Sequence, residues 1–96
     1  MFSLFRSVPS ISIRDFSAAL TAKTKVIDVR TPSEYRGGHI RNAANIPLNK
    51  IAHYSGKKEP LYVICQSGVR SKQAAKLLIK MGYDATTIRG GMNQWQ

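Results

Sequence analysis

The sequence is poor in three features, and each absence argues against one class of protein. A single cysteine among 96 residues cannot form an internal disulfide, so we expect a protein of a reducing compartment, the cytoplasm. No stretch approaches the ~18 consecutive apolar residues of a membrane-spanning helix, so no membrane partner is expected. The cysteine and the two histidines lack the spacing of metal ligands, and we expect neither a metal nor another cofactor.

Acidic residues are also few, and the chain is strongly basic. Five Asp or Glu residues stand against 15 Lys or Arg residues, which gives a formal net charge of +10. Lys72, Lys76 and Lys80 recur at every fourth position and form one stripe on a predicted helix. This stripe either attracts anionic substrates by long-range steering or is an ordinary solvated helix face. Nucleic-acid binding is not expected, because no motif or interleaved aromatic and basic patch accompanies the charge.

The length of the chain suits one domain. We expect residues 1–9 to form an N-terminal tail and residues 10–96 to form the domain. Strands alternate with helical stretches, which predicts an α/β layered fold with a mostly parallel sheet and helices on both faces. Strands are predicted at residues 25–29, 45–47, 61–64 and 83–88. Helical segments are predicted after Ser12, between Thr31 and Gly37, at 49–54, at 71–81 and at 91–95.

The most informative stretch is residues 61–82, in which a strand, a short loop and a helix follow one another. Residues 61–64 are apolar, with β-branched and aromatic members, as in a buried strand. From Ser71 onward the apolar residues fall at helical spacing. Between these elements, Cys65 lies at the carboxyl end of the strand, where ligands bind in open α/β sheets. The loop of residues 65–70 is therefore the candidate active site.

A thiol in this position can be chemically active. Cysteine reacts as its thiolate, and a helix N-terminus with a nearby guanidinium can lower its pKa from about 8.5. The N–H groups of the loop could curl toward the sulfur of Cys65, and Gly68 permits the left-handed backbone that such a curl needs. Arg70 would then offer a planar fork of donors to an oxyanion. The alternative is a buried core thiol, but the spacing of Gly68 and Arg70 favours a reactive one.

The same loop carries a resemblance to a known family. The pattern Cys65-x-x-Gly68-x-Arg70-Ser71 resembles the active-site loop of single-domain rhodaneses, which are thiosulfate sulfurtransferases. The resemblance covers roughly residues 10–95 and implies a rhodanese-like three-layer sandwich. Its further landmarks, in chain order, are Asp28-Val29-Arg30, Glu34-Tyr35, Gly38-His39-Ile40, Ala44-Asn45-Ile46-Pro47-Leu48 and Gly90-Gly91-Met92 followed by Trp95.

The resemblance implies sulfur transfer through a covalent intermediate. Cys65 would attack the outer sulfur of thiosulfate, a small anionic donor, and sulfite would leave a persulfide on the cysteine. A thiol, cyanide or a protein acceptor would then take this sulfur. Arg70 would bind the sulfonate as a second catalytic residue, and Asp28 and Arg30 would organise the surrounding loops. The substrate-binding loop would comprise Gln66, Ser67, Gly68, Val69 and Ser71.

Two alternative functions remain. The protein could be a persulfide carrier that needs a specific protein partner, because the chain has no second cysteine to resolve a persulfide. A phosphatase is disfavoured, because phosphatases of this fold have a longer spacing than the four residues between Cys65 and Arg70. Gln66 stands where many family members carry a basic residue, which removes one charge from the loop. The donor, the acceptor and the oligomeric state stay open at this point.

Overall fold

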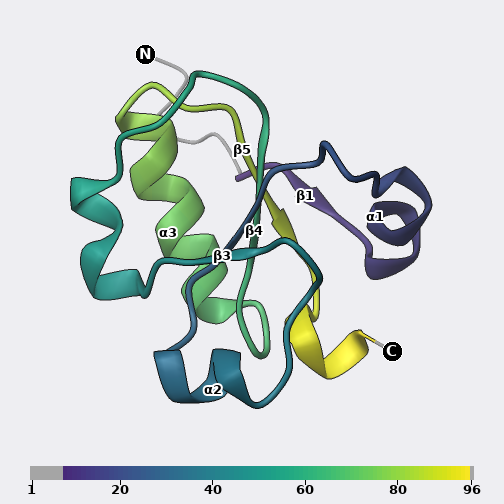
Figure 1. Cartoon of the computed structure of the whole chain (residues 1–96). Coiled ribbons are helices and arrows are strands. Elements are labelled where there is room, and N and C mark those ends of the chain that lie inside the picture. Colours follow the sequence, from purple (N-terminus) through teal and green to yellow (C-terminus); the bar gives the residue numbers. More distant parts are fainter. Residues whose placement is uncertain (1–7, 96) are drawn as a thin grey trace.

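Five strands form one sheet in this computed structural model, which describes residues 8–95. The strands are β1 (Ser10–Ile11), β2 (Val26–Asp28), β3 (Ala44–Asn45), β4 (Leu61–Ile64) and β5 (Ala85–Ile88). The α-helices are α1 (Ile13–Ala19), α2 (Pro32–Arg36) and α3 (Val69–Lys80), and the 3₁₀ helices are η2 (Leu48–His53) and η3 (Gly91–Gln94), as Figure 1 shows.

The sheet has the strand order β1-β5-β4-β2-β3, and each of these pairings is parallel. The predicted α/β class with a parallel sheet is therefore confirmed. Strand β4 lies at the centre and matches the strand predicted at residues 61–64. Because the strands are parallel, their carboxyl ends meet at one edge of the sheet, and Cys65 follows β4 at that edge.

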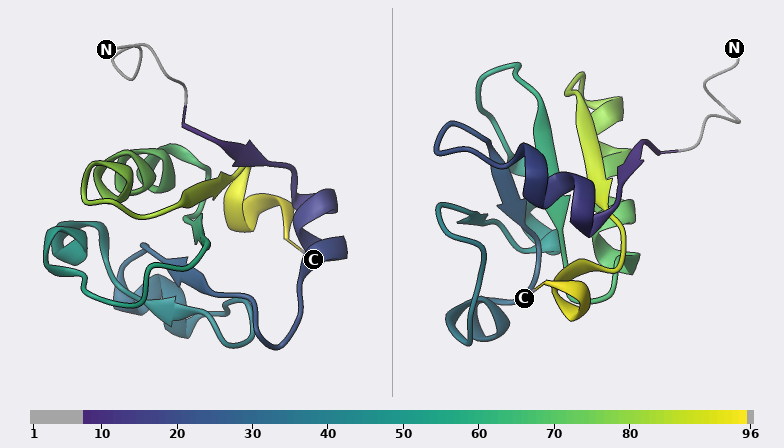
Figure 2. Two further views of the ribbon diagram at one scale, coloured as in Figure 1. Left: turned by 90° about the horizontal axis from the view of Figure 1, so that it is seen from above. Right: turned by 90° about the vertical axis from the view of Figure 1, so that its right-hand side faces the viewer.

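Helices cover both faces of the sheet and make the three layers that were predicted (Figure 2). Val63 of β4 belongs to one core cluster, together with Leu78 of α3 and a residue of η2, Ile51. Its neighbour Ile64 belongs to the other cluster, together with Phe16 of α1. The two clusters lie on opposite faces because successive side chains of a strand alternate. Two separate cores thus hold β4, and the loop that follows it, in place.

Two element boundaries differ from the prediction for local reasons. Helix α3 begins at Val69, two residues early, because Gly68 with a φ of +108° already serves as its N-terminal cap. Strand β5 begins at Ala85, not at Tyr83 as predicted. The N–H of Tyr83 instead donates to the carbonyl of Leu78 and completes the last turn of α3.

Further differences lie at the edges of the sheet, while β2, η2 and η3 differ from their predicted bounds by no more than one residue at each end. Strand β3 stops before Pro47, which has no N–H to extend a ladder, and η2 begins at Leu48. Strand β1 was not predicted, because two residues are too few for an alternating pattern. Its pairing with β5 is extended by a bond of 2.9 Å from the Thr87 N–H to the Pro9 carbonyl. Most of the predicted tail, residues 1–7, lies outside the described residues. No helix within residues 8–95 is long and apolar enough to cross a membrane.

Candidate active site

The Cys65 thiol lies just beyond the carboxyl end of β4 and has no exposed surface. The Gly68 N–H donates a hydrogen bond to its Sγ at 2.9 Å. Gly68 has a φ of +108°, a left-handed conformation that glycine adopts without strain. The backbone turn that the sequence predicts at Gly68 is therefore present, and it directs a backbone donor at the sulfur.

The groups around the sulfur favour its ionised form. Burial is the largest single influence on the pKa of Cys65 and raises it, because a buried charge loses hydration. The hydroxyl and N–H of Ser71 and the N–H groups of Gly68 and Ser67 act in the opposite direction, and the net effect lowers the pKa of Cys65. The Ser71 hydroxyl also lies 2.7 Å from the Thr87 hydroxyl and 3.2 Å from the Gly68 carbonyl. A hydroxyl carries one proton, so donation to the sulfur competes with donation to that carbonyl.

Arg70, at the start of α3, binds a carboxylate of α2. Its guanidinium donates to Glu34 Oε1 at 2.7 Å and to Glu34 Oε2 at 3.0 Å. The bonds from Arg70 are the largest cause that lowers the pKa of Glu34 to about 2, the Thr31 N–H adds to this effect, and the same contact raises the pKa of Arg70. The sequence predicted an oxyanion partner for Arg70 but missed Glu34, which lies 36 positions away in the chain. The two are close because α2 and α3 both begin near the same sheet edge.

Glu34 itself is fixed by the start of its own helix. The Thr31 hydroxyl accepts a hydrogen bond from the Glu34 N–H, and Glu34 Oε1 accepts one from the Thr31 N–H at 2.9 Å. This reciprocal capping box holds the carboxylate in one orientation. Thr31 is thus the N-terminal cap of the helix that the sequence predicts between Thr31 and Gly37. Arg70 therefore meets a carboxylate that is already in position.

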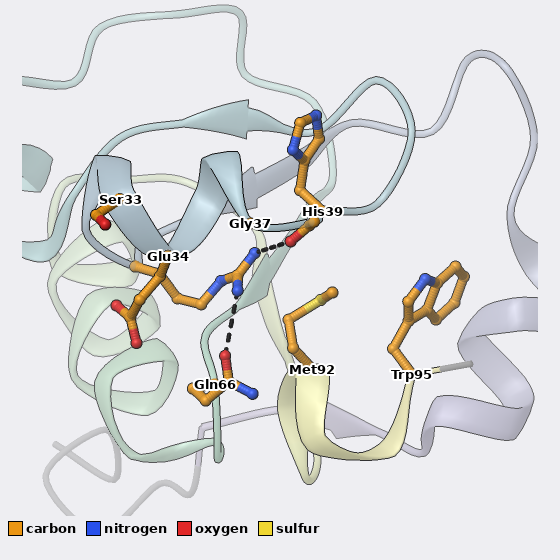
Figure 3. Close-up of a pocket in the computed structure, with 9 residues that line it drawn as sticks. Ser33, Glu34, Gly37, His39, Gln66, Met92 and Trp95 are labelled. Atoms are coloured by element: carbon orange, nitrogen blue, oxygen red, sulfur yellow. Dashed lines mark hydrogen bonds between the residues drawn. The ribbon is translucent and has the colours of Figure 1, made fainter.

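Arg30 joins three segments around the thiol loop. It follows β2 and is buried with Asp28, whose carboxylate accepts bonds from Arg30 Nε at 3.0 Å and Nη2 at 2.8 Å. Arg30 Nη2 also donates to the Gly38 carbonyl at 2.8 Å, and Nη1 donates to Gln66 Oε1 at 3.1 Å (Figure 3). This buried ion pair and its further hydrogen bonds hold the three segments in place, because the loss of either charged partner would leave an unpaired charge in the interior.

Gln66, directly after the thiol, bridges two elements. It accepts the bond from Arg30 and donates from its Nε2 to Asn93 Oδ1 of η3 at 2.8 Å. The Gln66 side chain is thus held by one cationic partner, Arg30, and one neutral partner, Asn93. Asn93 was not among the predicted site residues, and nothing in its spacing indicates this contact.

The start of η3 packs directly on the backbone of the thiol loop. The Met92 N–H donates to the Cys65 carbonyl at 2.8 Å, and the Asn93 N–H donates to the Gln66 carbonyl at 2.9 Å. A Cβ atom on Gly91 would lie 2.3 Å from the Cys65 carbonyl oxygen, so only glycine allows this approach. Gly91 is therefore required for the close approach of η3 to the thiol loop.

A pocket of about 510 Å³ lies beside this assembly (Figure 3). Its polar wall includes Arg30, Glu34 and Gln66, and its apolar wall is made by Met92 and Trp95. Trp95 is half-buried and packs against the core cluster that contains Phe16, and it also lines this pocket. The other lining residues are Ser33, Gly37, Gly38 and His39.

The structure thus places the predicted site residues in two groups. Gly68, Ser71 and the N–H of Ser67 surround the sulfur of Cys65. Gln66, Asp28 and Arg30 form the network beside it. The Val69 side chain is 66% exposed to solvent, so the loop residue Val69 contributes mainly through its backbone. Within residues 8–95, no three His, Cys, Asp or Glu side chains gather as a metal site.

Comparisons with known proteins point in one direction. The family described as the rhodanese-like domain matches residues 12–96. The uncharacterized protein YqhL of Bacillus subtilis is 36% identical over 94% of this chain and 74% of its own length. The thiosulfate sulfurtransferase GlpE of Shewanella oneidensis is 30% identical over 93% of both chains. A solved rhodanese-like domain protein from Staphylococcus aureus superposes with a TM-score of 0.85 at 33% identity, over 93% of this chain and 92% of that one.

Proposed function

The chain belongs to the rhodanese-like domain family, and from that premise we propose that it moves sulfane sulfur through a persulfide on Cys65. The donor is thiosulfate or a related sulfur anion, and the acceptor is a thiol, cyanide or a protein thiol. One observation carries this proposal: the thiol follows a central strand, and the loop after it directs the Gly68 N–H at Cys65 Sγ at 2.9 Å, an arrangement that lowers the pKa of the thiol. A lowered pKa raises the fraction of reactive thiolate at a given pH, which distinguishes this thiol from an inert core cysteine.

The reaction has two displacement steps. In the first, the Cys65 thiolate attacks the outer sulfur of thiosulfate, the bond between the two donor sulfurs breaks, and sulfite leaves with its electron pair. In the second, the acceptor thiolate attacks the outer sulfur of the persulfide. The Sγ–S bond breaks, and Cys65 returns to its thiolate form. No net oxidant or reductant is needed.

The residues of the loop have distinct roles in this proposal. The N–H groups of Ser67, Gly68 and Ser71 hold negative charge on the sulfur of Cys65, as preorganised donors do in other covalent enzymes. Arg70 binds the donor's sulfonate. Glu34 already accepts one hydrogen bond from each terminal nitrogen of Arg70, so the donor competes with this carboxylate for the guanidinium.

A second candidate function is that of a persulfide carrier. It is supported by the Cys65 side chain, which has no exposed surface, and by the lack of a second cysteine in the sequence. A carrier would release its sulfur only when a protein partner opens the loop. We regard the cytoplasm as the compartment in either case, since a reduced thiol is required.

The test is intact mass spectrometry of the reduced protein after incubation with thiosulfate. The expected result is the gain of one sulfur atom, which cyanide or a small thiol then removes. Cys65→Ser should gain nothing. A folded protein with a free thiol and no added sulfur would reject the proposal. A persulfide that small thiols leave in place, and that a protein thiol removes, would favour the carrier instead.

A further inference from the structure

A second pocket, of about 500 Å³, borders the thiol loop. We call it the basic pocket. Its lining residues are Val8, Ser10, Gly68, Lys72, Lys76, Thr87, Arg89 and Gly90. Gly68 is the residue that it shares with the thiol loop, and the N–H of Gly68 donates to the sulfur of Cys65. The two pockets have no lining residue in common.

The basic pocket contains three cations and no carboxylate. Lys72 and Lys76 lie one turn apart on α3, and Arg89 follows β5. Arg89 is oriented by a hydrogen bond of 2.8 Å from its Nη1 to the Ser10 hydroxyl. The residues outside the described range, 1–7 and 96, include no Asp or Glu that could neutralise these charges.

The charges of the other pocket, by contrast, are already matched. Arg30 is paired with Asp28, and Glu34 with Arg70. Within residues 8–95 these are the two ion pairs with short contacts, and neither lysine of the basic pocket belongs to one. An anionic ligand that approaches the thiol loop therefore meets unmatched positive charge on the basic-pocket side.

The size of the basic pocket indicates which anion it suits. Pockets of about 300–1,000 Å³ hold whole small molecules, whereas thiosulfate has only a few atoms and would fill a small part. Cations that come from two different elements favour a ligand with more than one negative group. Thiosulfate, the donor of the proposed reaction, is too small to carry several separate negative groups. The acceptor thiol can carry them on its carbon skeleton.

We propose that the basic pocket binds the sulfur acceptor, and that this acceptor is a small thiol with two or more carboxylates. This inference rests on the proposed function. The carboxylates contact Lys72, Lys76 and Arg89, and the acceptor's thiolate attacks the outer sulfur of the Cys65 persulfide. The Sγ–S bond breaks, Cys65 leaves as its thiolate, and the acceptor becomes the persulfide.

The experiment compares acceptors that differ in charge. Cys65 is loaded with thiosulfate, excess donor is removed, and loss of the persulfide is followed by intact mass spectrometry. The acceptors are 2-mercaptoethanol, with no charge beyond the thiol, 3-mercaptopropionate, with one carboxylate, and mercaptosuccinate, with two. Rates are expressed per thiolate. We expect mercaptosuccinate to react at least about tenfold faster than 2-mercaptoethanol, a gain typical of local electrostatic attraction.

Two double variants distinguish binding in the basic pocket from attraction by the overall positive charge of the protein. In a double variant, Lys72→Gln with Lys76→Gln, the rate ratio of mercaptosuccinate to 2-mercaptoethanol should fall toward one. The matched control, Lys80→Gln with Lys57→Gln, loses the same charge outside the pocket and should keep the ratio. A ratio that is unchanged in the first variant, or that falls equally in both, overturns the proposal.

A binding measurement on the protein without a persulfide distinguishes failure of the acceptor-pocket proposal from failure of the proposed sulfur transfer. Mercaptosuccinate should shift the amide NMR signals of Gly68, Thr87 and Gly90 in the unmodified protein and in the control variant, but not in the Lys72/Lys76 variant. Absence of these shifts overturns the pocket itself. If the shifts appear but thiosulfate leaves no sulfur on Cys65, the sulfur-transfer function fails and the acceptor role fails with it.

Discussion

At the scale of single residues, the site keeps its charges in pairs and stabilises the thiolate with dipoles. Asp28 matches Arg30, and Glu34 matches Arg70. The groups that lower the pKa of Cys65 are backbone N–H groups and the Ser71 hydroxyl. Preorganised neutral donors can hold a sulfur anion without attracting every anion in solution. The thiolate of Cys65 is therefore stabilised without a direct ion pair, while Arg30 and Arg70 bind carboxylates.

Removing the Ser71 hydroxyl should weaken the thiolate. In the unmodified protein, alkylation of Cys65 by iodoacetamide should speed up as pH rises, with a midpoint below that of the denatured chain, because the folded pKa is lowered. In Ser71→Ala that midpoint should move upward, because one of the opposing donors is lost while burial remains. Circular dichroism confirms that the variant is folded. An unmoved midpoint would show that the backbone N–H groups suffice.

Glu34→Gln should release Arg70 for the donor. Glutamine can still accept the Thr31 N–H bond and keep the capping box, but it no longer forms an ion pair. We expect the KM for thiosulfate to fall several-fold, with little change in kcat, because only donor binding gains. Glu59→Gln is the matched control, since it makes the same charge change in the loop before β4 and should leave KM unaltered. A higher KM would mean that Glu34 holds Arg70 in its productive position.

At the scale of elements, the docking of η3 on the thiol loop joins the last segment of the chain to the reactive one. Two backbone hydrogen bonds and one glycine contact make this joint, so its geometry depends little on side chains. It also brings Asn93 to Gln66 and places Met92 and Trp95 on the pocket wall. The pocket beside the thiol therefore exists only while η3 stays docked.

Gly91→Ala should separate η3 from the loop. The added Cβ would meet backbone atoms of Cys65 and Gln66 at 2.3–2.8 Å, and Gly91 has a φ of +57°. Overpacking of this kind costs about 1–3 kcal/mol, which lowers the melting temperature by about 4–8 °C per kcal/mol in a domain of this size. Thermal unfolding measures the loss, and sulfur loading should slow as well.

The control for this variant is Gly82→Ala. A Cβ there would meet only the flexible end of Lys58, at 3.3 Å, while the φ of +97° imposes backbone strain without a clash. Its stability should fall less, and its sulfur loading should stay normal. If both variants load sulfur at the same rate, the η3 joint has no role in the reaction.

At the scale of the whole molecule, the fold could be predicted from the sequence better than the site. The strand at residues 61–64 and the helix after it follow from local periodicity, and Gly68 follows from what a tight loop requires. The Glu34–Arg70 pair and the Gln66–Asn93 bond could not be predicted in this way. Their partners lie 36 and 27 positions apart, and sequence spacing carries no information on distances across the fold. The basic pocket escaped prediction for the same reason, because Arg89 and the α3 lysines meet only in three dimensions.

The net charge of +10 also acts on the molecule as a whole and should make sulfur loading depend on salt. Thiosulfate is a dianion, so the field of the protein raises its encounter rate, and salt screens that field over about 10 Å at 0.1 M. We expect the second-order rate constant for loading to fall several-fold as NaCl rises from about 0.02 to about 0.5 M. Alkylation of Cys65 by iodoacetamide, a neutral reagent, is the control and should change little. If loading ignores salt, or if both rates fall in parallel, the charge does not steer the donor, and the stripe of Lys72, Lys76 and Lys80 has no long-range effect on loading.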